Sequence, residues 1–276
     1  MIKTRCITLG KFEKNAINED AVCARKNMIA VSDGAGGGGL FADRWSKYLV
    51  NHLPHNPITT AEQLDEWIGS IWESYYNKAE ESAKKLGGMA LDKFYDEGSF
   101  ATLAAVWSQK DNTCQWMTYG DSVVFHYDYA TKKLTHSFSS LADFNNAPYL
   151  INCKDELNLD GFQCGTFPLT KNSIVFVASD ALSHYILMIY ELSRKEEYAA
   201  EFEKSPTSNS KNSNLIVKAQ SLPNINFEKD VIGKLRRSVY NKSVFRKLTE
   251  SIYRKGFLAM DDYSLAVMYE KIDLNG

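Results

Sequence analysis

The chain has 276 residues, which at about 150 residues per domain allows one large domain or two small ones. Hydrophobic residues make up 44% and charged residues 24%, which excludes a wholly disordered, collagen-like or coiled-coil chain. The 32 Lys and Arg against 34 Asp and Glu leave a formal net charge of -2, so no global positive field attracts nucleic acid or an anionic membrane. We therefore expect a globular protein with neither nucleic acid nor a membrane as partner.

Five cysteines are odd in number, widely spaced and never arranged as C-x-x-C, a pattern typical of neither a disulfide framework nor a zinc site. The N-terminal residues lack the features of a secretory signal, and no apolar run reaches the roughly 18 residues of a membrane-spanning helix. These observations predict a cytoplasmic protein in a reducing compartment.

The first third of the chain predicts strands followed by two helices. Short apolar stretches that alternate with polar residues indicate strands at Ile2–Leu9 and within Ala21–Val31. Apolar residues at three- and four-residue steps predict a helix over Leu40–Leu53. A second helix is predicted over Thr60–Leu86, where Thr60 and Gln63 form a capping pair.

The middle of the chain predicts an antiparallel meander of four strands, followed by a loop-rich stretch over Ser139–Thr170. The four strands are Ser99–Trp107, Cys114–Tyr119, Ser122–Tyr129 and Lys133–Phe138. A strongly apolar strand, Ser173–Ala178, comes next.

The last third predicts a helix from Asp180 to about Lys204, a Ser/Asn-rich break at Ser205–Asn214, and a helix from about Glu228 to Lys255. A closing strand is predicted at Ser264–Tyr269. The break is interpreted as a surface loop and not a domain linker, because the closing strand is needed to complete the sheet. This element order predicts an α+β fold with helices covering the sheet faces.

Four aspartates lie where an apolar strand-like run ends or begins: Asp33, Asp121, Asp180 and Asp261. Glu19 and Asp20 add two carboxylates just before the second strand stretch. If the strands are neighbours, these acids meet at one edge of the sheet, where their repulsion is relieved by protonation or by a cation. An all-oxygen ligand set favours Mg²⁺ or Mn²⁺, and two such ions would support hydrolysis of a phosphate ester.

Taken singly, each aspartate has a structural explanation. Asp33 would sit in a turn, Asp121 in a hairpin and Asp261 at the end of a loop, while Asp180 would cap its helix. The order and the flanking residues of all four shift the balance toward a shared site.

Six short motifs, in this order, resemble those of the metal-dependent protein serine/threonine phosphatases of type 2C, in particular the bacterial ones. They are Asn18-Glu19-Asp20, residues 31–37 (VSDGAGG), residues 98–102 (GSFAT), Gly120-Asp121-Ser122, residues 178–182 (ASDAL) and residues 261–264 (DDYS). Each string is weak alone, but six occur in order, and the match extends from residue 18 to residue 269. The resemblance implies a four-layer α/β/β/α sandwich, with two antiparallel sheets flanked by helices.

The resemblance also implies roles for the acids. Asp33 would bridge two metal ions, the Gly34 carbonyl would bind one of them, and Asp180 and Asp261 would hold the first. Asp20 and Glu19 would act largely through metal-bound waters, and Asp121 would support a weaker third ion. A water between the ions would then attack phosphorus directly, with Asp33, Asp180 and Asp261 as the catalytic acids.

One departure concerns the substrate phosphate. Many members of the family place a phosphate-gripping arginine where this chain has Asn15, and asparagine lacks the permanent charge and the bidentate geometry of arginine. Lys14 or Lys11 would substitute only as a point charge. We place Lys14 and Asn15 in the substrate-binding region.

His184 and the Gly36–Gly39 run each allow two interpretations. His184 lies four residues after Asp180, where it would either donate a proton to the leaving group or, more in keeping with a lone histidine, serve as a partly exposed structural residue. The Gly36–Gly39 run is either a flexible turn or a loop that brings backbone close to a bound phosphate.

We therefore expect a single type 2C phosphatase-like domain over residues 1–276, with a helical elaboration at about 190–255 whose deletion at Ser205–Asn214 leaves metal binding intact. The predicted activity is hydrolysis of phosphoserine and phosphothreonine in a phosphorylated protein substrate, dependent on two or three Mn²⁺ or Mg²⁺ ions. The alternatives are a catalytically weakened, phosphate-binding regulatory module and a phosphatase of small metabolites. The oligomeric state is not predicted.

Overall fold

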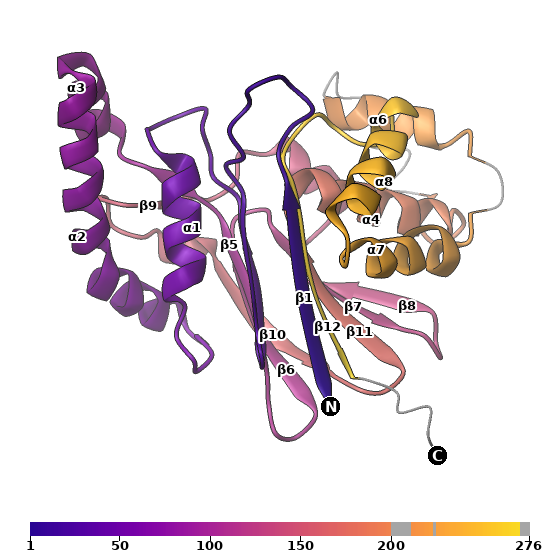
Figure 1. The fold of residues 1–276 in the computed structure, drawn as a ribbon. Helices are drawn as coiled ribbons and strands as arrows, with labels where there is room; N and C mark the ends of the chain where they lie inside the picture. Colours follow the sequence, from indigo (N-terminus) through magenta and orange to yellow (C-terminus); the bar gives the residue numbers. More distant parts are fainter. Residues whose placement is uncertain (200–210, 223–224, 271–276) are drawn as a thin grey trace.

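Two five-stranded antiparallel sheets stacked face to face form the centre of the molecule (Figure 1). The computed structural model describes residues 1–199, 211–222 and 225–270. The strands are β1 (Ile2–Leu9), β2 (Ala21–Arg25), β3 (Met28–Ser32), β4 (Phe100–Ala101), β5 (Leu103–Ser108), β6 (Thr113–Tyr119), β7 (Val123–Asp128), β8 (Lys133–His136), β9 (Ile151–Asn152), β10 (Phe162–Pro168), β11 (Ser173–Ala178) and β12 (Tyr263–Glu270). The first sheet has the order β1-β12-β11-β7-β8 and the second the order β10-β6-β5-β3-β2, while β4 and β9 form a separate pair.

Helices cover the outer face of each sheet (Figure 1). They are α1 (Ala42–His52), α2 (Ala61–Leu86), α3 (Gly88–Glu97), α4 (Asp180–Leu192), α6 (Lys211–Ala219), α7 (Gly233–Ser238) and α8 (Lys242–Arg254), with a π-helical turn, η4 (Glu228–Ile232), before α7 and 3-10 turns η1 (Leu141–Asn145) and η2 (Leu159–Gly161). One apolar cluster joins α1 and α2 to the second sheet, and another joins α4, α7 and α8 to the first. A third cluster, which includes Val31, Val106, Val177 and Ala266, fills the space between the sheets. The predicted four-layer α/β/β/α sandwich is confirmed.

The last strand lies inside the first sheet. β12 pairs with β1 on one side, with Ile7 opposite Leu265, and with β11 on the other, with Val177 opposite Ala266. The sheet is therefore complete only when both ends of the chain have come together.

The predicted four-strand meander is wrong. β5 and β6 pair with each other, but β7 belongs to the other sheet, where it pairs with β11 and β8. The crossing is made at Gly120, whose φ of 98° is a left-handed conformation that side chains disfavour. A Cβ there would also meet Thr102 and the Tyr149 carbonyl at 2.7 Å, so the turn is built for glycine.

Several elements differ from the sequence-based expectation. The stretch 21–31 forms a hairpin of two strands, and α3 lies in a region without a prediction. β9 and β10 lie in the stretch predicted as loop. β10 was hard to detect because it pairs along one side only and buries Phe167 alone, so its sequence lacks a clear apolar face.

The late helices are shorter than predicted. α4 ends at Leu192, and Ser193 closes it by donating its N–H to Ile189 and its hydroxyl to the Tyr190 carbonyl. The predicted helix end at 200–204 and the part of the predicted break at 205–210 lie outside the described residues, and the remainder of that break, 211–214, is the start of α6.

The predicted helix from Glu228 to Lys255 is divided into η4, α7 and α8. The division falls at Asn241, whose side chain accepts the N–H groups of Ser243 and Val244 and so caps α8. The proposed helical elaboration and the effect of its deletion stay predictions, and the deletion is better confined to residues 205–210 so that α6 is spared. None of the helices within the described ranges is long and apolar enough to cross a membrane.

Candidate metal centre

Asp33 follows directly on the central strand β3. Its N–H donates to the Thr102 hydroxyl at 3.2 Å, and its carbonyl accepts the Thr102 N–H at 2.8 Å. The next residue, Gly34, packs so closely that a Cβ would lie 2.6 Å from the Glu19 carbonyl oxygen and 2.7 Å from that of Ala42. The backbone that presents the Asp33 carboxyl group is therefore held on both sides.

Asp180 and Asp261 are brought together where β11 ends and β12 begins. Ser179 and Ser264 join the two strands: the Ser264 N–H donates to the Ser179 hydroxyl at 3.0 Å, and the Ser179 N–H donates to the Ser264 carbonyl at 3.2 Å. Ser179 occupies the N-cap position of α4, and Asp180 is the first residue inside the helix. The explanation of Asp180 as a helix cap is thus not supported.

Asp20, at the entrance to β2, is 6% exposed. Neither of its carboxyl oxygens has a hydrogen bond of normal geometry in the structure, although the hydroxyls of Ser264 and Ser179 lie near enough to act on its pKa. A buried carboxyl group without partners is costly, so it calls for a cation or a proton.

Asp262 is a site residue that the sequence analysis did not single out. Its carboxylate is buried and accepts the N–H of Lys11 at 2.8 Å and the N–H of Glu19 at 2.7 Å. It ties the loop after β1 to the start of β12, across more than two hundred residues. The adjacent pair Asp261-Asp262 was visible in the sequence, but nothing there divided the two roles.

Lys11 lies among the acids. Its Nζ is 3.6 Å from Asp261 Oδ1 and 3.8 Å from Glu19 Oε2. Burial acts to lower the pKa of Lys11, but the neighbouring carboxylates of Asp261, Asp262 and Glu19 outweigh it and raise that pKa.

The acids influence one another strongly. Burial raises the pKa of Asp33 well above its ordinary value of 3.8, and the charges of Asp20, Asp180, Asp121 and Asp261 raise it further. Burial also raises the pKa of Asp180, with Asp121 and Asp261 as the next causes.

Burial also raises the pKa values of other acids in the group. Burial brings the pKa of Asp20 to about 7, and it brings that of Asp121 to about 6. The pKa of Glu19 is also raised, by burial, although Lys11 opposes the shift. The structure therefore gathers all the predicted acids into one electrostatic group.

The acids lie close enough to affect one another's pKa, but they do not form a ready coordination shell. Within the described ranges, no three His, Cys, Asp or Glu side chains stand as a group that could hold an ion as they are. The acids affect one another's pKa without standing within coordination distance of a shared ion, because electrostatic effects reach further than a coordination bond. Like charges without a cation also keep apart. The all-oxygen donors and the partnerless Asp20 fit Mg²⁺ or Mn²⁺.

The predicted substrate-binding residues make no recorded contact with the acids. Lys14 and Asn15 are exposed in the loop between β1 and β2, and their side chains make no hydrogen bond or ion pair with any described residue. Asn15 has a φ of 65°. Their role stays a prediction.

His184 and the Gly36–Gly39 run, which each allowed two interpretations, lie in different surroundings. His184 is only 2% exposed, not partly exposed as expected, and lies edge-on to Phe144. Burial lowers the pKa of His184 to about 4, so near neutral pH the ring is uncharged and is not the imidazolium that acts as a general acid, which favours the structural interpretation. Gly36 lies against the Glu19 carboxylate, so the glycine run borders the acids.

No family model and no curated protein matches the sequence. Solved structures do match: a serine/threonine phosphatase of Staphylococcus aureus has a TM-score of 0.57 at 13% identity, with 99% of this chain and 96% of that one covered. The chain has the type 2C phosphatase fold.

Two further structures with this fold are similar over nearly their whole length. PppA of Pseudomonas aeruginosa, a regulatory component of a type VI secretion system, has a TM-score of 0.52 at 13% identity, with 97% of both chains covered. The catalytic domain of the phosphatase PstP, crystallised with two manganese ions, has a TM-score of 0.54 at 15% identity, again with 97% of both covered. At these identities the likeness establishes the fold and leaves the chemistry to be argued from the residues.

Proposed function

We propose that this protein is a Mn²⁺- or Mg²⁺-dependent phosphatase that removes phosphate from phosphoserine and phosphothreonine in proteins. One observation carries the proposal: five aspartates from separate strand ends form a single electrostatic group, and the buried carboxyl oxygens of Asp20 in it have no hydrogen bond of normal geometry. The fold shared with known phosphatases supports the same conclusion.

The acids divide the work of holding the ions. Asp33, the Gly34 carbonyl, Asp180 and Asp261 would hold the ions. Asp20 and Glu19 would act through water, and Asp121 would support a weaker third ion. Bound divalent ions supply an activated water and neutralise the charge of the phosphoryl group during in-line displacement.

The surrounding residues keep these acids in place. Thr102 fixes the Asp33 backbone and shares a hydrogen bond with the Ser122 hydroxyl at 2.8 Å. Asp262 holds the N–H groups of Lys11 and Glu19, so the Lys11 ammonium stays at the rim of the acidic group, where it would meet an incoming phosphate.

A weakened, phosphate-binding regulatory module is the second candidate. It is favoured by the residues proposed to meet the phosphate: Asn15 has no charge, and Lys11 is already engaged by Glu19 and Asp261. A low affinity for the substrate phosphate follows if no other cation takes part.

The deciding experiment measures hydrolysis of p-nitrophenyl phosphate, a phosphothreonine peptide and a panel of small phosphorylated metabolites with Mn²⁺ and with chelator. Asp33→Asn and Asp180→Asn are compared with Asp92→Asn, an exposed residue of α3. We expect metal-dependent turnover of the peptide that both site variants lose and the control keeps. Tight phosphate binding without turnover supports the module, and turnover of metabolites alone contradicts the protein substrate.

The proposal also includes a cellular compartment and a partner. All five cysteines are free, which agrees with a reducing compartment, and the cytoplasmic location stays a prediction. A phosphorylated protein is the proposed partner.

A further inference from the structure

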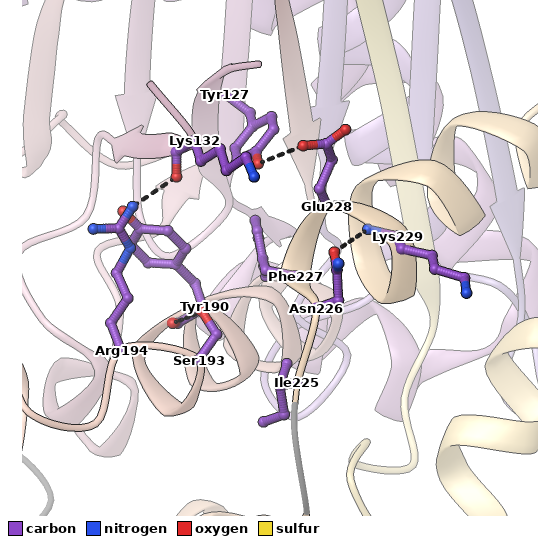
Figure 2. Close-up of a pocket in the computed structure, with 10 residues that line it drawn as sticks. All are labelled: Tyr127, Lys132, Tyr190, Ser193, Arg194, Ile225, Asn226, Phe227, Glu228 and Lys229. Carbon is purple, nitrogen blue, oxygen red and sulfur yellow. Dashed lines mark hydrogen bonds between the residues drawn. The ribbon is translucent and has the colours of Figure 1, made fainter. Parts of the chain in front are cut away.

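Two hollows lie side by side around η4, away from the acids. The first, of about 520 Å³, is bordered by the β7–β8 turn, the end of α4 and residues 225–229, as Figure 2 shows. The second, of about 670 Å³, lies between Tyr129, α7 and Tyr269 near the end of β12. Glu228 and Lys229 border both, so the two hollows adjoin at these residues, and together they form the depression considered below.

Positive charge dominates this depression, although the whole chain has a net charge of -2. Five cations and one carboxylate line it, and we call it the basic groove: Lys132, Arg194, Lys229, Arg236, Arg237 and Glu228. Within the described part of the chain, only Arg194 among these cations has a carboxylate partner, Glu197 at 3.2 Å. The other four leave their charge available to an anion.

The two arginines at the ends of the groove are held in position. Arg194 stacks on the Tyr190 ring at 5.1 Å and donates to the Lys132 carbonyl at 2.8 Å. Arg236 stacks on the Tyr269 ring at 4.5 Å. Because their side chains are already ordered, a bound carboxylate or phosphate would cost little additional conformational entropy.

Helix α4 sets the distance between the groove and the acids. Asp180 is its first residue, and Ser193 and Arg194, just after its end, border the groove. Its 13 residues at about 1.5 Å each span about 20 Å. An extended peptide advances about 3.3 Å per residue, so at least about six residues separate two groups bound at the two places.

We infer that the basic groove binds an acidic segment of the phosphoprotein substrate, at least about six residues from the phosphorylated residue. The inference rests on the proposed function for the identity of the partner. Two hollows that adjoin suit an extended chain better than a compact anion. Its excess of positive charge selects carboxylates on that chain.

The first test measures binding without catalysis. A fluorescein-labelled oligoglutamate peptide is titrated with the metal-free protein in chelator, and its polarisation is followed at low and high salt. Lys229→Gln/Arg237→Gln removes two exposed charges from the groove, and Lys110→Gln/Lys171→Gln removes two exposed charges elsewhere. We expect the groove variant to weaken binding about fivefold, and the control to stay within about twofold of the wild type.

Three results would contradict the inference that the basic groove binds an acidic segment. They are no binding by the wild type at low salt, equal binding by the groove variant, and equal weakening by the control variant. Because the assay needs no turnover, it separates failure of the groove from failure of the proposed phosphatase activity. Circular dichroism melting of both variants establishes that they are folded.

The second test measures the spacing. Phosphothreonine peptides carry an acidic block at increasing distance on either side of the phosphothreonine, and KM is measured with Mn²⁺. We expect KM to fall only when the spacer exceeds about six residues, and this gain to be lost in the groove variant. A gain at every spacing, or one that persists in the groove variant, would place the acidic segment elsewhere and contradict the inference.

Discussion

Asp262 shows how one side chain organises the rim of the acidic group. Its carboxylate accepts the backbone N–H groups of Lys11 and Glu19, and so positions one cation and one carboxylate at once. Its neighbour Asp261 faces the other acids. Two adjacent aspartates thus have different tasks, one as a positioning residue and one as a proposed ligand.

Asp262→Asn is expected to lower the free energy of unfolding by about 2 kcal/mol, because an amide has only one acceptor oxygen and leaves one buried N–H poorly paired. Urea unfolding followed by circular dichroism measures the change. Asp92→Asn, at an exposed position on α3, serves as the control and should alter stability little. An unchanged unfolding midpoint in Asp262→Asn would show that the two N–H groups find other partners.

Lys11→Met is expected to tighten Mn²⁺ binding about threefold, since the ammonium of Lys11 neutralises two of the carboxylates that attract the ion. Isothermal titration calorimetry gives the affinity directly. Lys14→Met removes the same charge from the same loop, but Lys14 makes no ion pair with a described residue, so the affinity should stay unchanged. Weaker Mn²⁺ binding in Lys11→Met would instead mean that the lysine supports the site.

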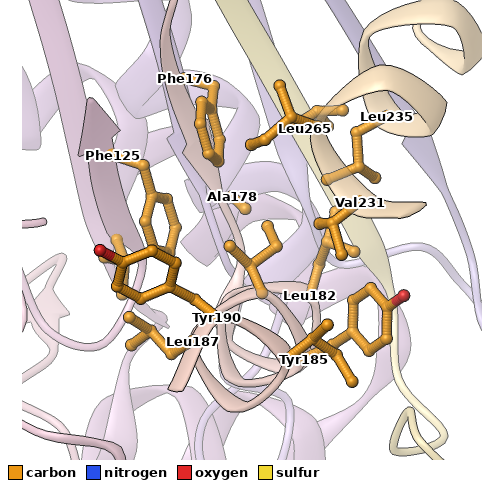
Figure 3. Close-up of a cluster of buried hydrophobic side chains, with 14 of the residues drawn as sticks. Phe125, Phe176, Ala178, Leu182, Tyr185, Leu187, Tyr190, Val231, Leu235 and Leu265 are labelled. Atoms are coloured by element: carbon orange, nitrogen blue, oxygen red, sulfur yellow. The ribbon is translucent and has the colours of Figure 1, made fainter. Parts of the chain in front are cut away.

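At the scale of elements, α4 connects the proposed metal centre to the core. Every residue of α4 after Asp180 is buried, and Figure 3 shows several of its side chains facing the first sheet near Phe125, Phe176 and Leu265. The helix therefore cannot shift without repacking this core. Asp180 takes its position from apolar contacts and from the strand that precedes it.

Leu182→Ala removes a side chain that is fully buried between α4 and the sheet, and the cavity should cost about 2–5 kcal/mol. Urea unfolding measures this loss. Val244→Ala on α8, where the side chain is 47% exposed, is expected to change stability by no more than about 0.5 kcal/mol. Equal losses in the two variants would contradict the packing described for α4.

On the scale of the whole molecule, the acidic group lowers the stability of the folded state when its carboxyl groups are ionised. The folded pKa values of about 7 for Asp20 and about 6 for Asp121 lie above the ordinary value of 3.8. The folded state therefore holds these protons more tightly than the unfolded chain, and raising the pH from about 4 to about 7 removes stability through these groups. Above their folded pKa values no further loss arises from them.

Mn²⁺ should accordingly raise the melting temperature more at pH 8 than at pH 5, because protons compete with the ion at the lower pH. Differential scanning fluorimetry with Mn²⁺ and with chelator measures the two shifts. The buried histidines have lowered pKa values and act in the opposite sense, but they contribute equally with and without the ion. Equal shifts at both pH values would show that the ion does not bind the acids with raised pKa.

The sequence by itself determined the α+β class, the early helices and the acids, while the four layers were implied by the family resemblance. The apolar spacing of Leu40–Leu53 and Thr60–Leu86 predicted α1 and α2, and the acids Asp33 and Asp180 stood at strand ends where the structure has them. Local patterns determine such features because helix and strand periods and turn residues act over only a few positions.

Only the tertiary structure decided which sheet each strand joins and which side chains meet. β7 leaves the meander for the other sheet at Gly120, Asp262 rather than Asp261 holds the loop after β1, and Lys11 enters the acidic group. These outcomes depend on contacts between residues far apart along the chain. A strand's own residues are compatible with either partner, and only the burial achieved by the complete fold selects one.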